Sequence, residues 1–303
     1  MSRESKRVFR AGTVALFGWT NVGKSTLLNR LVGDKIAAVA DVAQTTRRRI
    51  TGVLNVPGRG QIAFVDTPGL HRPRNAMNRA MVEAARGAIH DVDLVALMVD
   101  ASRGLGEGDR ETATMLAHAR VQRVLVLNKI DCVRPKERLL PMMQTAVEQW
   151  GLAEALPVSA RTGAGCEELI DAFLKHMPES RPHYPDDFLT DQSERTIAAE
   201  LVREKLLHLT HMELPHATAV LVEGWEVRDD GLVEITATIL VDRETQKRIV
   251  IGRKGALLKQ AGSEARAELE QLLDRRVFLQ LWVKVRKDWR DDERTLRELG
   301  LRG

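Results

Sequence analysis

Residues 18–25 read Gly-Trp-Thr-Asn-Val-Gly-Lys-Ser, and this G-x-x-x-x-G-K-S pattern constrains the fold more than any other stretch. An apolar run at 13–17 precedes it and a helical pattern at 26–31 follows, so a strand, a loop and a helix are expected in that order. In that setting backbone N–H groups and the helix N-terminus face phosphate oxygens. The predicted phosphate contacts are Gly18, Asn21, Val22, Gly23, Lys24, Ser25 and Thr26. The plain alternative is a chance match in a glycine turn.

Two side chains of this loop have specific predicted roles. Lys24 would reach the β- and γ-phosphates, and the Ser25 hydroxyl would ligate Mg²⁺.

Length and composition set the broad class. With 303 residues and 44% hydrophobic content, two packed domains are expected. No apolar run reaches the ~18 residues needed to span a bilayer, and the charged first residues do not resemble a signal peptide, so we expect the chain to stay where it is made. Two cysteines without a CxxC pair indicate reduced thiols, and neither a disulfide framework nor a zinc site.

Residues 13–174 alternate strand-like and helical segments, which predicts a doubly wound α/β domain with a mostly parallel sheet. Ligands of such sheets bind beyond the carboxyl ends of the strands. The expected strands are 13–17, 50–56, 62–65, 94–99, 124–127 and 156–158.

A proline-rich stretch at 176–187 predicts a linker. We therefore divide the chain into a nucleotide-binding domain at 1–176, a linker at 177–190 and an α+β domain at 191–303. In the last, helices are expected at 193–209, 255–273 and 288–299, and strands at 217–227, 232–241 and 277–285.

Asp66-Thr67-Pro68-Gly69 closes the strand at 62–65. Asp66 is positioned to hold Mg²⁺ through water, and the Gly69 amide to donate to the γ-phosphate. The tetrapeptide alone is typical of an ordinary turn, and it gains weight from lying about forty residues after a phosphate loop.

Asn128-Lys129-Ile130-Asp131 follows the strand at 124–127 and predicts guanine. A carboxylate at Asp131 accepts hydrogen bonds from guanine N1–H and N2–H₂, whereas adenine would leave it unpaired at a cost of roughly 1 to 3 kcal/mol or more. Asn128 would brace the loop and Lys129 would lie along the base. Ser159 and Ala160, after the next strand, are the last expected contacts.

Gln44, Thr45, Thr46 and Arg47 lie between these motifs and are the predicted switch segment. A threonine there completes the Mg²⁺ shell and senses the γ-phosphate, and we favour Thr46. The alternative is a polar loop that caps the following strand. Taken together, the motifs predict a GTP-binding and GTP-hydrolysing switch domain.

Leu70 follows the Asp66–Gly69 motif where Ras-like proteins have a water-orienting glutamine. A leucine cannot polarise water, so we expect slow unaided turnover with no assigned catalytic base. Lys24, Asn21 and Gly69 are expected to assist.

The second domain contains a G-x-x-G turn between an apolar run and a helix, in the element order of a type II KH module. The segment 242–290 holds 13 Lys or Arg and 7 Asp or Glu, which favours an anionic partner. A solvated basic turn is the alternative. Predicted RNA contacts are Ile249, Ile251, Gly252, Arg253, Lys254 and Gly255.

Other residues of this domain are less specific. Trp282 and Trp289 are more typical of a core than of base stacking, and Lys284 and Arg286 are either RNA-facing or solvated.

These motifs, with the stretches 243–255 and 283–294, resemble the bacterial Era family of GTPases along essentially the whole chain. The family has Arg-Pro-Asn where this chain has Trp19, Thr20 and Asn21. That departure leaves the glycines, the lysine and the serine intact.

The resemblance implies a factor of small (30S) ribosomal subunit assembly that binds the 3′ end of 16S rRNA through the KH domain and is coupled to the cell cycle. It implies GTP or GDP and Mg²⁺ as ligands, and K⁺ held near Asn21. It further implies a cytoplasmic location with peripheral contact to the inner face of the plasma membrane, and a monomer is expected because no coiled-coil heptads occur.

Two other functions stay open. One is a nucleotide-gated interaction module at the membrane or division machinery, which needs a basic amphipathic face with exposed apolar residues. The other is a constitutive RNA-binding protein whose nucleotide is structural.

Overall fold

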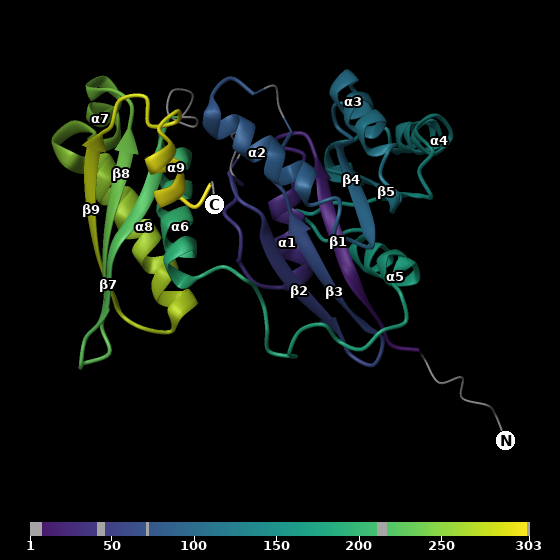
Figure 1. Ribbon diagram of the computed structural model, residues 1–303, viewed down its shortest axis with the longest axis horizontal. Coiled ribbons are helices and arrows are strands. Elements are labelled where there is room, and N and C mark those ends of the chain that lie inside the picture. The colour runs from purple at the N-terminus through teal and green to yellow at the C-terminus, as the bar shows by residue number, and fades with distance from the viewer. Residues whose placement is uncertain (1–7, 41–45, 71–72, 211–216, 302–303) are drawn as a thin grey trace. The chain divides into compact units, whose positions relative to one another are not determined.

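The computed structural model describes residues 8–40, 46–70, 73–210 and 217–301, which form two compact units (Figure 1). Unit 1 contains Met1–Ile36, Arg48–His71 and Val82–Asp191, and unit 2 contains Ala37–Arg47, Arg72–Met81 and Gln192–Gly303. Of the predicted switch segment, the described residues Thr46 and Arg47 therefore group with the second domain.

Unit 1 is built on a six-stranded sheet in the order β2-β3-β1-β4-β5-β6, in which only β2 runs antiparallel to its neighbour. The predicted doubly wound α/β fold is confirmed. The strands are β1 (Arg10–Gly18), β2 (Ile50–Val56), β3 (Gly60–Asp66), β4 (Leu94–Asp100), β5 (Gln122–Asn128) and β6 (Ala155–Pro157).

Helices cover both faces of this sheet because its central strands are apolar on both sides. On one face Ala15 and Phe17 of β1 pack with α2 (Ala76–Gly87), α3 (Glu107–Leu116) and α4 (Leu139–Trp150). On the other lie α1 (Lys24–Val32), which contacts β2 and β3, and α5 (Cys166–His176), whose Phe173 ring lies 5.9 Å from that of Phe64. Short 3₁₀ turns occupy Ile130–Cys132 and Lys136–Arg138.

The predicted linker is packed along unit 1. The buried Gln61 side chain accepts from the His183 and Tyr184 amides, and Thr190 donates to the Thr51 carbonyl. Residues 177–190 are thus fixed to β2 and β3 at several points.

Unit 2 has a three-stranded sheet in the order β7-β8-β9, with β7 and β8 antiparallel and β8 and β9 parallel. Its elements are α6 (Glu194–Leu209), β7 (Ala219–Val227), β8 (Val233–Val241), α7 (Glu244–Ile251), a 3₁₀ turn at Arg253–Gly255, α8 (Ala256–Leu273), β9 (Val277–Val285) and α9 (Glu293–Glu298). This is the predicted KH order.

The two faces of that sheet are covered differently. Helices α6, α7 and α8 pack on one face around Val202, Val250 and Ala265. On the other, Trp289 forms a cluster with α9 and with Met77 of the segment 72–81. The helix predicted at 288–299 begins only at Glu293, because Asp292 accepts from the Thr295 amide as its N-cap.

Among the helices of the described ranges, none combines the length and apolar character required to cross a bilayer.

Candidate nucleotide-binding and nucleic-acid-binding sites

The phosphate loop connects the end of β1 to the start of α1, as its pattern predicts. Gly23 is the N-cap residue of α1 and has a φ of 96°, a backbone conformation that residues with a Cβ atom disfavour. A Cβ at Gly23 would lie 2.3 Å from Asn128 Nδ2, so the position also requires glycine for space. The phosphate loop and the predicted base loop are therefore in direct contact.

Lys24 is the buried cation of this loop, with 6% of its surface exposed. Its Nζ donates to the carbonyls of Gly18 and Trp19, at 3.2 and 3.0 Å. Burial lowers its pKa to about 8, against the opposing effect of Asp66. The ammonium is held inside the loop by weak acceptors that phosphate oxygens can replace.

Ser25 and Asp66 bring two hard oxygen donors together. The Ser25 hydroxyl donates to Asp66 Oδ2 at 2.6 Å, and Asp66 is fully buried at the end of β3. Oxygen donors of this kind suit Mg²⁺, which keeps several waters and phosphate oxygens in its shell. The pair fits the predicted metal site.

The stretch after β3 is fixed against β1. Thr67 donates to the buried Leu16 carbonyl, and the Leu70 amide donates to Gly18 O at 3.1 Å. A Cβ at Gly69 would lie 2.8 Å from Thr20. Leu70 itself belongs to the apolar core, so its side chain packs and presents no polar group.

The Asn128–Asp131 stretch braces the phosphate loop. Asn128 donates to the Val22 carbonyl at 2.8 Å and accepts from the Ala160 amide at 2.9 Å. Lys129 donates to the Asn21 carbonyl and to Asp100 Oδ2, both at 2.7 Å.

Asp100, at the end of β4, is a site residue that the motifs missed. Burial alone would raise its pKa, but hydrogen bonds from Lys129 and Ser102 outweigh it and lower the pKa overall. Its place at a strand's carboxyl end was the available signal.

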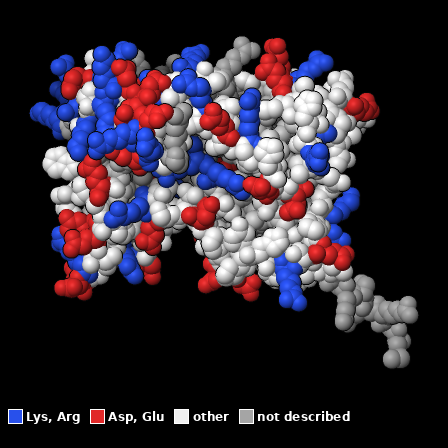
Figure 2. Space-filling model, viewed as in Figure 1, with Lys and Arg blue, Asp and Glu red and all other residues white. Residues whose placement is uncertain are grey.

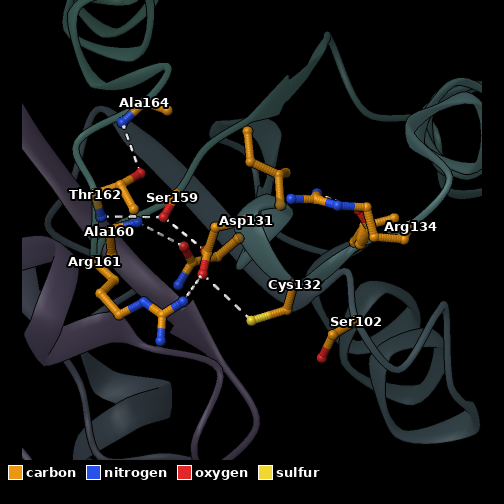
Figure 3. A network of polar contacts seen from close by, with 12 residues as sticks. Ser102, Asp131, Cys132, Arg134, Ser159, Ala160, Arg161, Thr162 and Ala164 are labelled. Carbon is orange, nitrogen blue, oxygen red and sulfur yellow. Dashed lines mark hydrogen bonds and ion pairs between the residues drawn. The ribbon is translucent and has the colours of Figure 1, made fainter.

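Asp131 lies at the centre of a polar network (Figure 3). Its Oδ1 accepts from the Ser159 hydroxyl at 2.7 Å, and its Oδ2 accepts from Arg161 and from Cys132 Sγ at 3.3 Å. The Ser159 hydrogen bond, opposed by burial and assisted by Cys132 and Arg161, lowers the pKa of Asp131. The carboxylate is ionised at neutral pH, as guanine recognition requires.

The switch segment is described from Thr46 onward, and Gln44 and Thr45 lie outside the described residues. Thr46 and Arg47 are buried within unit 2. The Arg47 guanidinium lies 5.6 Å from the Trp289 ring centroid, a cation–π arrangement. Burial, with repulsion from Arg203, lowers the pKa of Arg47 to about 9, so it keeps its charge at neutral pH.

The G-x-x-G turn separates α7 from α8. Gly252, Lys254 and Gly255 all have positive φ, at 73°, 52° and 78°. A Cβ at Gly252 would lie 2.7 Å from Leu257 Cβ, whereas one at Gly255 would meet nothing within 4 Å. Arg253 and Lys254 are exposed at the tip of the turn.

A groove of about 360 Å³ begins at Gly255 and runs between α8 and β9. The predicted Ile249 and Ile251 lie on α7 and do not line it. Sequence patterns did not identify the other lining residues, although the five on α8 follow helical spacing. The other lining residues are Leu258, Lys259, Gly262, Ser263 and Arg266 of α8, and Leu279 and Leu281 of β9.

The two tryptophans named in the sequence analysis of unit 2 differ in burial. Trp289 is fully buried, as expected, but Trp282 is 58% exposed, so the prediction that it packs a core is wrong.

Two cations of this domain form ion pairs: Lys284 pairs with Glu223, and Arg286 pairs with Glu298. Figure 2 shows Lys and Arg gathered over α9, interspersed with acidic side chains. That basic region is partly neutralised within the protein.

Comparison with protein families identifies two regions. Residues 13–129 match a family described as 50S ribosome-binding GTPase, and residues 213–290 match the KH domain family.

Curated relatives match along the whole chain. The chain is 49% identical to GTPase Era of Geobacter metallireducens, covering 98% of this chain and 99% of the relative. It is 46% identical to GTPase Era of Geotalea uraniireducens with the same coverage.

Two solved structures are similar throughout, both with a TM-score of 0.92. One is Era in complex with MgGDPNP and nucleotides 1506–1542 of 16S ribosomal RNA, at 39% identity over 97% of this chain and 99% of that one. The other is a variant of Aquifex aeolicus Era bound to GDP·AlF₄⁻, at 40% identity over 96% and 99%.

Proposed function

Because the chain belongs to the Era family of GTPases, we propose that it is a GTP-hydrolysing switch that binds the 3′ end of 16S rRNA during small-subunit assembly. Its unit 1 reads guanine and phosphate, and its KH domain binds the RNA. The coupling to the cell cycle that the resemblance implies belongs to the same proposal.

One observation supports the proposal that nucleotide binding and RNA binding are coupled. Both segments that follow the phosphate contacts, Ala37–Arg47 and Arg72–Met81, belong to the same compact unit as the KH domain. The Val39 amide donates to Glu204, and the Ala76 amide donates to Asp291, at 2.8 and 2.7 Å. A change of these segments with the nucleotide state would therefore act directly on the RNA-binding unit.

At the nucleotide, each residue has a defined task. Lys24 neutralises the β- and γ-phosphates, and Asp131 accepts from guanine N1–H and N2–H₂. Ser25, Asp66 through water, and Thr46 would hold Mg²⁺, which when bound neutralises charge on the β- and γ-phosphates. The contact of Ser25 with Asp66 supports the first two assignments.

Hydrolysis depends on groups other than Leu70, whose side chain is packed in the core. We propose that potassium held near Asn21 assists turnover and that the unaided rate is low. Equal hydrolysis rates in potassium and sodium buffers would contradict the potassium assignment.

RNA binding is assigned to the G-x-x-G turn and the groove beside it. The positive φ values of Gly252, Lys254 and Gly255 expose backbone amides to a strand's phosphates, with Arg253 and Lys254 at the tip. Bases would enter the groove, where Leu279 and Leu281 offer apolar contact. Ile249 and Ile251 remain proposed contacts on the neighbouring helix.

Small-subunit association, a monomeric state and a cytoplasmic location with peripheral contact to the plasma membrane complete the proposal. Light scattering of the purified protein and co-sedimentation with anionic vesicles test the monomer and the membrane contact.

The KH assignment is tested with a short single-stranded RNA of the 16S 3′ end. Gly255→Asp places a negative charge in open space at the turn, and we expect RNA affinity to fall by about tenfold. Gly255→Asn is the matched control, because asparagine tolerates positive φ and adds no charge. Gly252 is unsuitable, since its substitution collides with Leu257. If Gly255→Asp and Gly255→Asn bind RNA equally well, the turn does not contact the phosphates.

A further inference from the structure

The Asp131 carboxylate that reads guanine is already paired with an arginine of the same unit. Arg161 donates to Asp131 Oδ2, the oxygen that also accepts from Cys132, while Ser159 donates to Oδ1 (Figure 3). Guanine N1–H and N2–H₂ together require both carboxylate oxygens. Each carboxylate oxygen has two lone pairs, and on Oδ2 both are taken by Arg161 and Cys132, so guanine and the Arg161 guanidinium compete for Oδ2.

The backbone around Arg161 is fixed independently of this ion pair. Arg30 of α1 donates from Nη2 to the Arg161 carbonyl at 2.7 Å and from Nε to the Ala160 carbonyl at 3.2 Å. The Ser159 hydroxyl also accepts from the Thr162 amide at 3.1 Å. The loop can keep its shape while the Arg161 side chain turns away.

The Arg161 side chain has room to turn. It is 75% exposed, whereas the Asp131 side chain is only 15% exposed. A solvated cation thus faces a carboxylate that is mostly covered by the protein. Without guanine the other donors to this carboxylate are the neutral Ser159 and Cys132 side chains, so the Arg161 cation adds stability to the nucleotide-free site.

We propose that Arg161 is a built-in competitor for the base site: it weakens guanine nucleotide binding and accelerates nucleotide release by occupying Asp131 Oδ2. The inference rests on the proposed guanine site and concerns a residue that none of the nucleotide-binding motifs contains. It gives the chain a means of speeding the release of bound guanine nucleotide that lies within its own sequence.

The expected size follows from the exposure of Arg161. Solvent-exposed ion pairs have strengths that correspond to about two- to five-fold in affinity. Arg161→Gln should tighten GDP binding and slow GDP release by about that factor. The gain should shrink at high salt, because exposed charges are screened over about one Debye length.

The experiment uses the full chain and GDP that carries an N-methylanthraniloyl group on the ribose. Its affinity and release rate are measured for the wild type, Arg161→Gln and Arg134→Gln. Arg134 is an exposed arginine three residues after Asp131 that donates to the Val133 carbonyl, so its substitution removes the same charge without touching the carboxylate. Only Arg161→Gln should tighten binding.

Asp131→Asn provides the second control, measured with xanthosine diphosphate. The Asn amide can donate to the xanthine 2-carbonyl and carries no charge to hold Arg161. In that background Arg161→Gln should change neither affinity nor release.

Two results would overturn the proposal. Weaker GDP binding by Arg161→Gln would mean that the guanidinium contacts the bound nucleotide, and equal effects in both backgrounds would mean that it acts through the loop. Failure of the guanine site itself is distinguishable. In that case the wild type would hold ADP as well as GDP, whatever stands at position 161.

Discussion

The phosphate loop and the G-x-x-G turn each place a lysine directly beside a glycine, Lys24 after Gly23 and Lys254 before Gly255, but they are built in opposite ways. Lys24 is buried and donates to carbonyls of its own loop, whereas Lys254 is exposed at the tip of a turn. The first site is a preorganised, largely water-excluded cradle, and the second is a charged surface shaped by backbone conformation.

This difference has consequences for function. A buried cation acts in a low dielectric and gives strong, specific binding whose strength depends on its protonation. An exposed cation gives weaker, salt-dependent attraction to any phosphate chain. Specificity for the nucleotide is therefore local, while specificity for RNA must come from the groove beside the turn.

The largest effect should come from removing the buried lysine. Lys24→Ala deletes a buried charged donor from the proposed phosphate site, and we expect GDP affinity to fall by about 100-fold in calorimetry. Lys175→Ala, at an exposed position of α5, is the matched control and should bind normally. If Lys24→Ala binds GDP within threefold of the wild type, the cradle is not the phosphate site.

Motif spacing predicts the residues that a nucleotide site would require, and it does not reveal residues that reach that site only through tertiary contacts. Lys24, Asp66 and Asn128 have motif spacings because phosphate, Mg²⁺ and loop geometry impose them. Asp100 and Arg30 have no such spacing, since they reach the site from β4 and α1 through contacts that only folding creates.

The same limit applies to the second unit. Sequence patterns predict the same environment for Trp282 and Trp289, namely a place in a core. Side chains alternate between the two faces of β9 and Trp282 lies on its exposed face, whereas Trp289, in the turn after β9, is buried. Lys259, Ser263 and Arg266 follow helical spacing, yet they line a groove only because β9 lies opposite α8. Periodicity identifies a face, and the neighbouring strand decides what that face does.

Coupling between the two sites should depend on Arg47. Its guanidinium lies over Trp289 within unit 2, so Arg47→Ala should loosen the switch segment from the RNA-binding unit. We expect the ratio of RNA affinities with a GTP analogue and with GDP to move toward unity by about five-fold or more. Fluorescence anisotropy of labelled RNA in both nucleotide states measures it.

Arg49 supplies the control for that experiment, because it is exposed two residues further along. Arg49→Ala should keep the wild-type ratio. An unchanged ratio in a folded Arg47→Ala protein would show that nucleotide state is communicated by another route.

The exposed lysine should have a smaller effect, of a different kind. Lys254→Ala should weaken binding of short RNA by about five-fold at low salt and lower the salt slope by about 0.7, the value for one phosphate of a single strand. GDP affinity should stay unchanged. A loss that is the same at every salt concentration would point to altered turn geometry instead of a lost phosphate contact.

The smallest expected effect is on the pH dependence of GDP binding, and it comes from the buried Lys24. With its pKa lowered to about 8 by burial, Lys24 loses its proton as the pH rises through 8, while phosphate binding favours the protonated form. GDP affinity should therefore fall by about three- to four-fold between pH 7 and 8.5, with proton uptake on binding, following linkage. Calorimetry in buffers of different ionisation enthalpy measures that uptake.

Lys24→Arg keeps its charge and should abolish the uptake. Proton uptake that persists in Lys24→Arg would assign the titration to another group.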